Sequence, residues 1–126
     1  MTLKFNVIPR KNPLKQDAAP KYYASAVSDG ELTLKQLAKR VSETSSFSEG
    51  DLMGILVTVL KIIPDALADG KIVRLGDLGS LRVSISSEGS DDEKKVTANN
   101  IKSASVTFTP GKDLKDAVNT FKFEKG

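Results

Sequence analysis

The stretch DGKIVRLGDLGSLRV, residues 69–83, decides the fold class of this chain of 126 residues. Before Gly70 the apolar residues recur at helical spacing, whereas after it they alternate with polar residues, as in a half-buried strand. The triplet Asp77-Leu78-Gly79 interrupts the alternation, which resumes at Leu81. The stretch therefore predicts the end of a helix, a strand, a tight turn and a second strand, which together indicate an α+β fold.

The segment immediately before this stretch, residues 48–69, predicts one long helix. Ser48 is placed to cap its first turn, and Asp51 follows at the third helical position. Gly70 suits the left-handed backbone conformation that often follows the last turn of a helix. Because Pro64 lacks a backbone N–H, we expect it to kink this helix or end it early.

Apolar residues occupy more than one face of the predicted long helix, although a surface helix needs only one apolar stripe. Each large aliphatic side chain left in water forgoes roughly 1.5–3 kcal/mol of burial. We therefore expect a homodimer with this helix at its centre. The predicted dimer-interface residues are Leu52, Leu56, Val59, Leu60, Ile63 and Leu67, while Met53, Ile55, Val57 and Ile62 occupy other faces.

The chain before the long helix predicts a shorter helix and an extended N-terminal segment. Thr33 and Gln36 have the spacing of a capping box, and apolar residues at helical spacing follow them. Residues 1–30 predict two strands separated by a loop over residues 10–19, which contains prolines. We therefore expect an N-terminal β segment over residues 1–30 and a second domain over residues 31–126.

The chain after the hairpin is expected to form an arm, a strand and a last helix. Residues 86–100 are rich in polar side chains and predict an exposed loop, so that the whole arm covers about residues 84–104. Alternation over residues 101–109 predicts a strand, and Pro110 suits the first position of a following helix. We expect Leu114, Ala117, Val118 and Phe121 to face inward from that helix, and residues 121–123 to end the chain as an extended tail.

Composition excludes several classes of enzyme. Without Cys or His the chain has no thiolate or imidazole to act as a nucleophile, a general base or a metal ligand. An enzyme built on carboxylates, lysine or tyrosine stays open, but the sequence shows no cluster of such residues. We therefore expect a protein that is not an enzyme and that uses no metal, cofactor or small-molecule substrate. No apolar run is long enough to cross a bilayer and no secretory signal is recognisable, so we expect no membrane partner and a cytoplasmic location.

Basic residues are distributed unevenly along the chain, whose formal net charge is +3. Residues 1–23 carry five basic side chains and one acidic one, and residues 71–83 carry three and one. The sequence pI of about 9.1 permits a polyanionic partner, although a solvated basic surface is an equally ordinary interpretation. From charge alone, Arg10, Lys11 and Lys15 form a candidate basic strip.

Two stretches together carry a resemblance to a known family: residues 69–83, quoted above, and FTPGKDLKDAV at residues 108–118. They resemble the HU and integration-host-factor family of bacterial histone-like DNA-binding proteins, over about residues 33–120. The resemblance implies an intertwined homodimer, with a helical body, a three-stranded antiparallel sheet and β-arms that embrace the DNA minor groove. The N-terminal extension looks like that of a longer HU-related subgroup.

The resemblance implies low-specificity, architectural binding of double-stranded DNA at the nucleoid. The residues that it suggests for contacting DNA are Arg74, Arg82, Lys94, Lys95, Lys102, Gly111 and Lys112. Gly111 would let backbone N–H groups approach a phosphate, and the others would supply cations. Two alternatives stay open: Lys94 and Lys95 could instead pair with adjacent acids, and the two arginines could serve solubility at a sheet edge.

The predicted arm departs from the family pattern. The family's Arg-Asn-Pro-x-Thr-Gly tip, whose proline wedges between base pairs, is replaced here by SEGSDDEKK, residues 87–95. This segment has no proline and carries four acidic residues against two lysines, so its tip would repel phosphate. An alternative function follows from this difference, in which an HU-fold dimer acts as a protein-interaction module without bending DNA.

Overall fold

The computed structural model describes residues 2–11, 14 and 19–126. The chain forms two compact units, which we call unit 1 (Met1–Thr33 together with Ala117–Gly126) and unit 2 (Leu34–Asp116). The first limit lies close to the expected boundary at residue 30, but Ala117–Gly126 clusters with the N-terminal strands and not with the helices. Lys15 and most of the loop expected over residues 10–19 lie outside the described residues.

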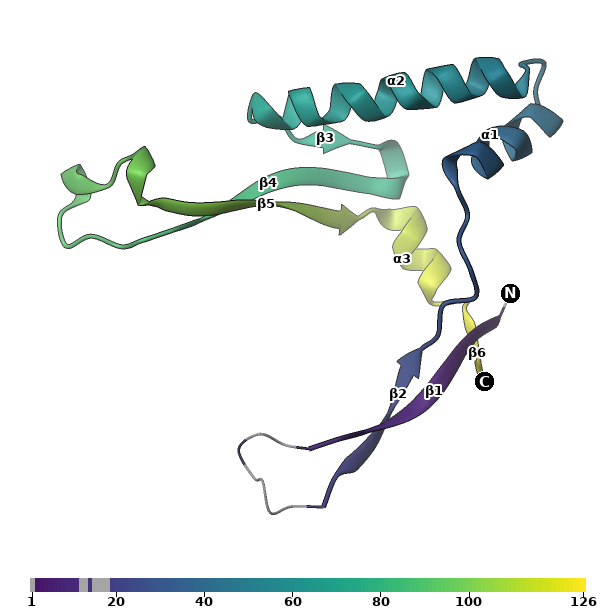
Figure 1. Ribbon diagram of the computed structural model, residues 1–126, viewed down its shortest axis with the longest axis horizontal. Helices are drawn as coiled ribbons and strands as arrows, with labels where there is room; N and C mark the ends of the chain where they lie inside the picture. The colour runs from purple at the N-terminus through teal and green to yellow at the C-terminus, as the bar shows by residue number, and fades with distance from the viewer. Residues whose placement is uncertain (1, 12–13, 15–18) are drawn as a thin grey trace. The chain divides into compact units, whose positions relative to one another are not determined.

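Unit 2 begins with the two predicted helices, α1 (Leu34–Glu43) and α2 (Glu49–Ala68), which pack against each other (Figure 1). The Ser48 hydroxyl accepts a hydrogen bond from the N–H of Asp51 at 3.1 Å, which confirms the predicted cap. Helix α2 passes through Pro64 without ending, so the expectation of an early end is wrong. Proline removes one backbone hydrogen bond. The C-terminal cap at Asp69 and the burial of Leu67 stabilise the last turn in spite of this loss.

The end of α2 is fixed by two backbone hydrogen bonds around Gly70. The N–H of Gly70 donates to the carbonyl of Leu67 at 3.0 Å, and the N–H of Lys71 donates to the carbonyl of Ala66 at 3.1 Å. This pair of bonds is a Schellman motif, which needs a left-handed residue at the position of Gly70, whose φ is +81°. The prediction that α2 ends at Asp69-Gly70 is confirmed.

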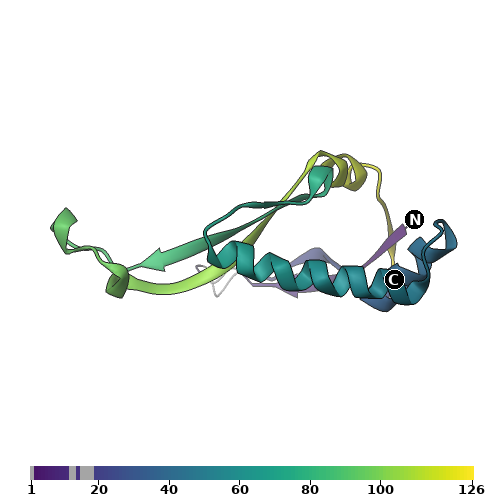
Figure 2. The same ribbon diagram turned by 90° about the horizontal axis from the view of Figure 1, so that it is seen from above.

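The sheet of unit 2 consists of β3 (Val73–Arg74), β4 (Gly79–Ser87) and β5 (Ile101–Pro110), in the order β3-β4-β5 with antiparallel neighbours. The three-stranded antiparallel sheet is therefore confirmed, although β3 is only two residues long. A 3₁₀ turn, η1 (Gly76–Leu78), joins β3 to β4. The paired β4 and β5 form a ribbon that continues beyond the C-terminal end of α2 (Figures 1 and 2).

The last helix begins later than predicted. Pro110 is the final residue of β5, where it pairs with Gly79, and helix α3 covers Lys112–Val118. The expectation that Pro110 opens this helix is wrong, because pairing with β4 holds it extended. Val118 and Phe121 were expected to face inward, but they are 53% and 39% exposed.

Unit 1 is a second three-stranded sheet, made of β1 (Thr2–Arg10), β2 (Lys21–Ala26) and β6 (Lys122–Lys125) in the order β2-β1-β6. The two predicted N-terminal strands are confirmed, and β1 continues through Pro9 to its last residue. The expected C-terminal tail is instead strand β6, which pairs in parallel with the first half of β1. Strand β2 pairs in antiparallel with the second half of β1.

None of the α-helices in the described part of the chain is long and apolar enough to span a membrane.

The core of the described chain is small. Its buried apolar residues are Ala38, Leu52 and Leu67, with relative exposures of 0%, 9% and 8%. Leu52 and Leu67 were predicted to lie in a dimer interface, but their own chain already covers them. Many other large apolar side chains are exposed, so the chain by itself buries little of its apolar surface.

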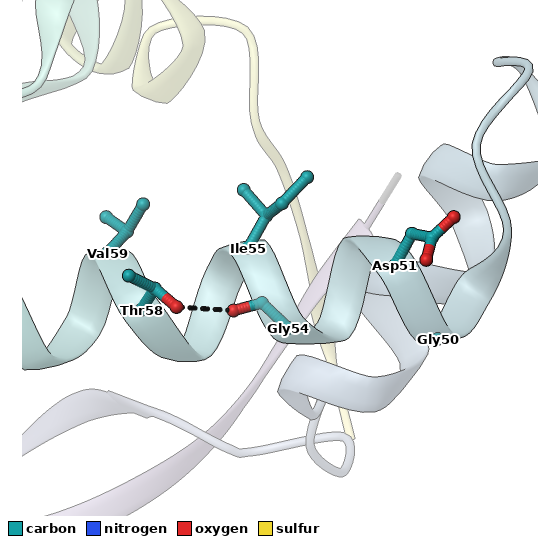
Figure 3. A pocket seen from close by; sticks show the side chains of 6 residues that line it. All are labelled: Gly50, Asp51, Gly54, Ile55, Thr58 and Val59. Carbon is teal, nitrogen blue, oxygen red and sulfur yellow. Dashed lines mark hydrogen bonds between the residues drawn. The ribbon is translucent and has the colours of Figure 1, made fainter.

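The uncovered apolar residues of α2 overlap the predicted stripe in part, because Val59 and Leu60 belong to that stripe and are 43% and 51% exposed. Ile55, Val59 and Ile62 are 51%, 43% and 58% exposed, and their spacing places them on one face of the helix. Ile55 and Val59 line a shallow groove together with Gly54 and Thr58 (Figure 3). The Thr58 hydroxyl donates to the Gly54 carbonyl at 2.8 Å, so its polar group is satisfied within the helix. We call Ile55, Val59 and Ile62 the exposed α2 stripe.

Candidate nucleic-acid interface

The β4–β5 ribbon has one apolar and one polar side. In the antiparallel register Leu81 lies opposite Phe108 and Val83 lies opposite Val106, which places these four side chains on one side of the sheet. The alternate residues project from the other side, which we call the polar face. It consists of Arg74, Ser80, Arg82, Ser84, Ser86, Ser103, Ser105, Thr107 and Thr109. The polar face thus carries two guanidinium groups among hydroxyl groups.

Arg74 and Arg82 lie close together on this face. Arg74 of β3 is opposite Ser80 of β4, and Arg82 follows Ser80 by two residues. Such diagonal neighbours are about 7–8 Å apart. Both arginines are exposed, and the planar guanidinium group suits recognition of phosphate oxygens. Because Arg82 is on the central strand, a solubility role at a sheet edge applies only to Arg74, which is on edge strand β3.

The hydroxyl groups of the polar face were not among the predicted site residues. They come from the segments SLRVSIS (80–86) and SASVTFT (103–109), in which Ser or Thr alternates with apolar residues. That alternation was the signal that could have identified them. The hydroxyl oxygens of Ser84 and Thr107 are 3.0 Å apart and share a hydrogen bond between the two strands. Ser80 is buried (8% exposed), whereas the hydroxyl groups of the other, exposed residues can donate to a phosphate or sugar oxygen as well as accept.

The predicted lysines are not gathered on the polar face. Lys94 and Lys95 lie in the 3₁₀ turn η2 (Glu93–Lys95) at the end of the arm. Lys102 lies where the register shifts between Ser86 and Ser87 and has no partner residue on β4. Lys112 is exposed at the start of α3. Of the predicted cations, the structure therefore brings together Arg74 and Arg82.

The tip of the arm, residues 88–100, is folded by local hydrogen bonds. The N–H of Glu88 donates to the carbonyl of Asn100 at 2.7 Å and closes the tip. The Asp92 carboxylate accepts from the N–H of Lys94 at 3.0 Å. A second turn, η3 (Ala98–Asn100), is held by a capping box that begins at Thr97. The lysines at the tip therefore share a compact structure with four acidic residues, which lowers its attraction for phosphate.

Gly111 has a structural role that the sequence did not reveal. Its N–H donates to the carbonyl of Leu78 at 2.8 Å, so this donor is used within the fold and is not free for a phosphate. A Cβ atom at this position would collide with the carbonyl oxygen of Asp77 in the turn η1. Glycine is required here because two backbone segments, the turn and the start of α3, lie in close contact.

Replacing Gly111 by Ala is expected to destabilise the protein by about 1–3 kcal/mol, because the added methyl group would push apart the turn at Asp77 and the start of α3. Gly89→Ala is the matched control, since a Cβ at that position meets nothing within 4 Å. Chemical denaturation measures both free energies of unfolding. Equal stability of the two variants would show that the close contact does not constrain residue 111.

Comparisons with known proteins identify the family of the chain. A family model described as an HU domain fused to a winged helix-turn-helix, Ig or glycine-rich motif (HU-HIG) matches residues 1–125. A mutant of HU from Thermotoga maritima has 29% sequence identity and a TM-score of 0.51, and the match covers 68% of this chain and 97% of that one.

A second solved structure, from Bacteroides vulgatus, is described as that of a candidate bacterial DNA-binding protein. It shares the fold of this chain at 14% sequence identity and a TM-score of 0.67. The match covers 98% of this chain, which spans about half (48%) of the longer Bacteroides chain. A comparison with curated protein sequences found no match. With the α+β architecture described above, the match of the family model over residues 1–125 shows that the chain belongs to the HU-HIG family of HU-related proteins.

Proposed function

We propose that this protein binds double-stranded DNA through the polar face, as a homodimer and with low sequence specificity. The observation that carries the proposal is the placement of two exposed arginines, Arg74 and Arg82, on one face of the sheet with a series of exposed hydroxyl groups. Membership of an HU-related family supports DNA as the polyanion. The role would be architectural and not enzymatic, at the nucleoid.

The proposed mechanism relies on contacts to the DNA backbone. The guanidinium groups of Arg74 and Arg82 neutralise phosphates and release condensed counterions, which favours binding at low salt. The exposed hydroxyl groups of the polar face donate to phosphate and sugar oxygens and fix the position of the ribbon along the groove. Because backbone contacts are the same for every base pair, this arrangement predicts little sequence preference.

The proposed dimer follows from the exposed α2 stripe. Three aliphatic side chains, Ile55, Val59 and Ile62, lie on one face of a regular helix and are about half exposed. Covering each of them contributes roughly 1.5–3 kcal/mol, less the fraction already buried within the chain. A second copy would cover this stripe and double the number of arginines presented to DNA.

Binding to random-sequence duplex DNA tests the proposal. If the four arginines of a dimer contact phosphates, a plot of log affinity against log salt should have a slope of about −3.6 or steeper. Fluorescence anisotropy of a labelled duplex, measured between low and physiological salt, provides this slope. Absence of saturable binding at the lowest salt would contradict the proposal.

The acidic tip supports a second candidate function, a protein-interaction module that does not bend DNA. The tip contains Asp91, Asp92 and Glu93, and the Asp92 side chain holds its own turn in shape. No proline is present between residues 87 and 100 to wedge between base pairs. This alternative predicts no saturable DNA binding in the salt titration, so the same measurement separates the two functions.

A further inference from the structure

The sheet of unit 1 also has two chemically different faces. Leu3, Phe5 and Phe123 lie on one face with Ala24 and Ala26, where they line an apolar groove. The alternate residues project from the opposite side, which we call the basic face. The register assigns to it Thr2, Lys4, Asn6, Ile8, Arg10, Lys21, Tyr23, Ser25, Lys122 and Glu124.

Four cations and one acid lie on the basic face. Lys4 and Arg10 come from β1, Lys21 from β2 and Lys122 from β6, and all four are exposed. Glu124 is the acid and lies opposite Lys4. Three separate strands thus contribute positive charge to one surface. The sequence suggested Arg10 as part of a basic strip, but it did not indicate that Lys4, Lys21 and Lys122 share a face with it.

One cross-strand pair indicates an anionic partner for this face. Arg10 lies directly opposite Lys21 in the β1–β2 register. Directly opposed like charges destabilise a sheet, so this pair costs stability in the free protein. An anion bound between the two side chains would relieve the repulsion.

The spacing of the cations fits an extended polyanion. Lys4 and Arg10 are six residues apart on one strand, which corresponds to about 20 Å at roughly 3.4 Å per residue. The same length of duplex contains about six base pairs and several phosphates on each strand. Tyr23, which is 48% exposed, and Asn6 lie between the cations and can donate hydrogen bonds to phosphate oxygens.

We propose that the basic face of unit 1 is a second surface that contacts duplex DNA, in addition to the polar face of unit 2. The inference rests on the proposed function, because DNA bound by the polar face makes a second contact from the same chain an intramolecular event with a raised effective concentration. The contact is with the phosphate backbone and adds affinity without adding sequence preference.

The test compares two double variants that remove the same charge from the full-length chain. Arg10→Gln/Lys21→Gln removes two cations from the basic face, and Lys35→Gln/Lys125→Gln removes one from α1 and one from the apolar side of the unit 1 sheet. We expect the first variant to lose at least about tenfold in affinity for a random duplex and the salt slope to fall by about 0.9 for each lost phosphate contact. The second variant should stay within about twofold of the unsubstituted protein.

Two further measurements keep the result specific. Without DNA, Arg10→Gln/Lys21→Gln should unfold at the same or a higher denaturant concentration, because the like-charge pair is removed. Arg10→Lys keeps the positive charge and should retain most of the affinity for DNA. If substitution at residue 10 lowered affinity by disrupting the fold, Arg10→Lys would lose affinity as well.

The outcomes distinguish failure of this inference from failure of the proposed function. If Arg74→Gln/Arg82→Gln weakens binding and Arg10→Gln/Lys21→Gln behaves like its control, the basic face is not a DNA contact while the proposed function stands. If neither the unsubstituted protein nor any variant binds DNA, the inference and the proposed function both fail. Vesicles containing phosphatidylglycerol provide the last comparison: loss of vesicle binding with unchanged DNA affinity in Arg10→Gln/Lys21→Gln would assign the basic face to a lipid surface and overturn the inference.

Discussion

Replacing Arg74 and Arg82 together by glutamine is expected to lower the affinity for random-sequence duplex DNA by more than about a hundredfold at low salt. Both guanidinium groups are exposed on the polar face, and a dimer would lose four of them. A charge-assisted hydrogen bond contributes roughly 1.5–3 kcal/mol, and about 1.4 kcal/mol corresponds to a tenfold change in affinity. Fluorescence anisotropy at several salt concentrations measures both the affinity and its salt slope.

The matched control is Lys35→Gln/Lys39→Gln, which removes the same charge from α1. Its affinity should remain within a few fold of the unsubstituted protein, because only long-range attraction is reduced and salt screens it. If both double variants lose the same affinity, binding depends on net charge alone, and the polar face would not be the contact surface.

The double substitution Ile55→Asp/Ile62→Asp is expected to abolish dimerisation, with a loss of more than about a thousandfold in the association constant. Both side chains are more than half exposed in the single chain, so an acid at either position costs a monomer little. In a dimer that covers the exposed α2 stripe, each unpaired buried carboxylate would cost several kcal/mol. Light scattering after size exclusion measures the mass, and denaturation at several protein concentrations measures the linked stability.

Val96→Asp is the control for this prediction. Val96 is an aliphatic residue of the arm tip and is 50% exposed, similar to the two α2 residues. The same chemical change at this position should leave the mass and the stability unchanged. A dimer that persists in Ile55→Asp/Ile62→Asp would place the interface elsewhere on the chain.

The candidate site was predicted in part from the sequence. The sequence predicts Arg74 and Arg82 as site residues, because the motif that contains them resembles a known family. The serines and threonines beside them on the polar face were not predicted. These residues are uncharged, and only the strand register shows that they share a face with the arginines. Gly111 was identified as a site residue, but for a phosphate contact and not for the close approach to Asp77 that the structure shows.

The sequence by itself determined the features that depend on neighbouring residues. The cap at Ser48, the left-handed residue Gly70 and the change of period after it specify where a helix ends and a strand begins, because each acts within a few residues. These local signals were sufficient for the α+β class and for most of the element order.

Only the tertiary structure decided which distant segments pair and which side chains they bring together. The parallel pairing of β6 with β1 joins the two ends of the chain, and no local periodicity encodes such a partner. Together with the antiparallel pairing of β2, it gathers Lys4, Lys21 and Lys122 on one face. The packing of α2 covers Leu67 while leaving Ile62 exposed. The physical reason is that the periodicity of side chains specifies which residues share a face of a strand or helix, whereas the neighbouring elements decide which face is buried.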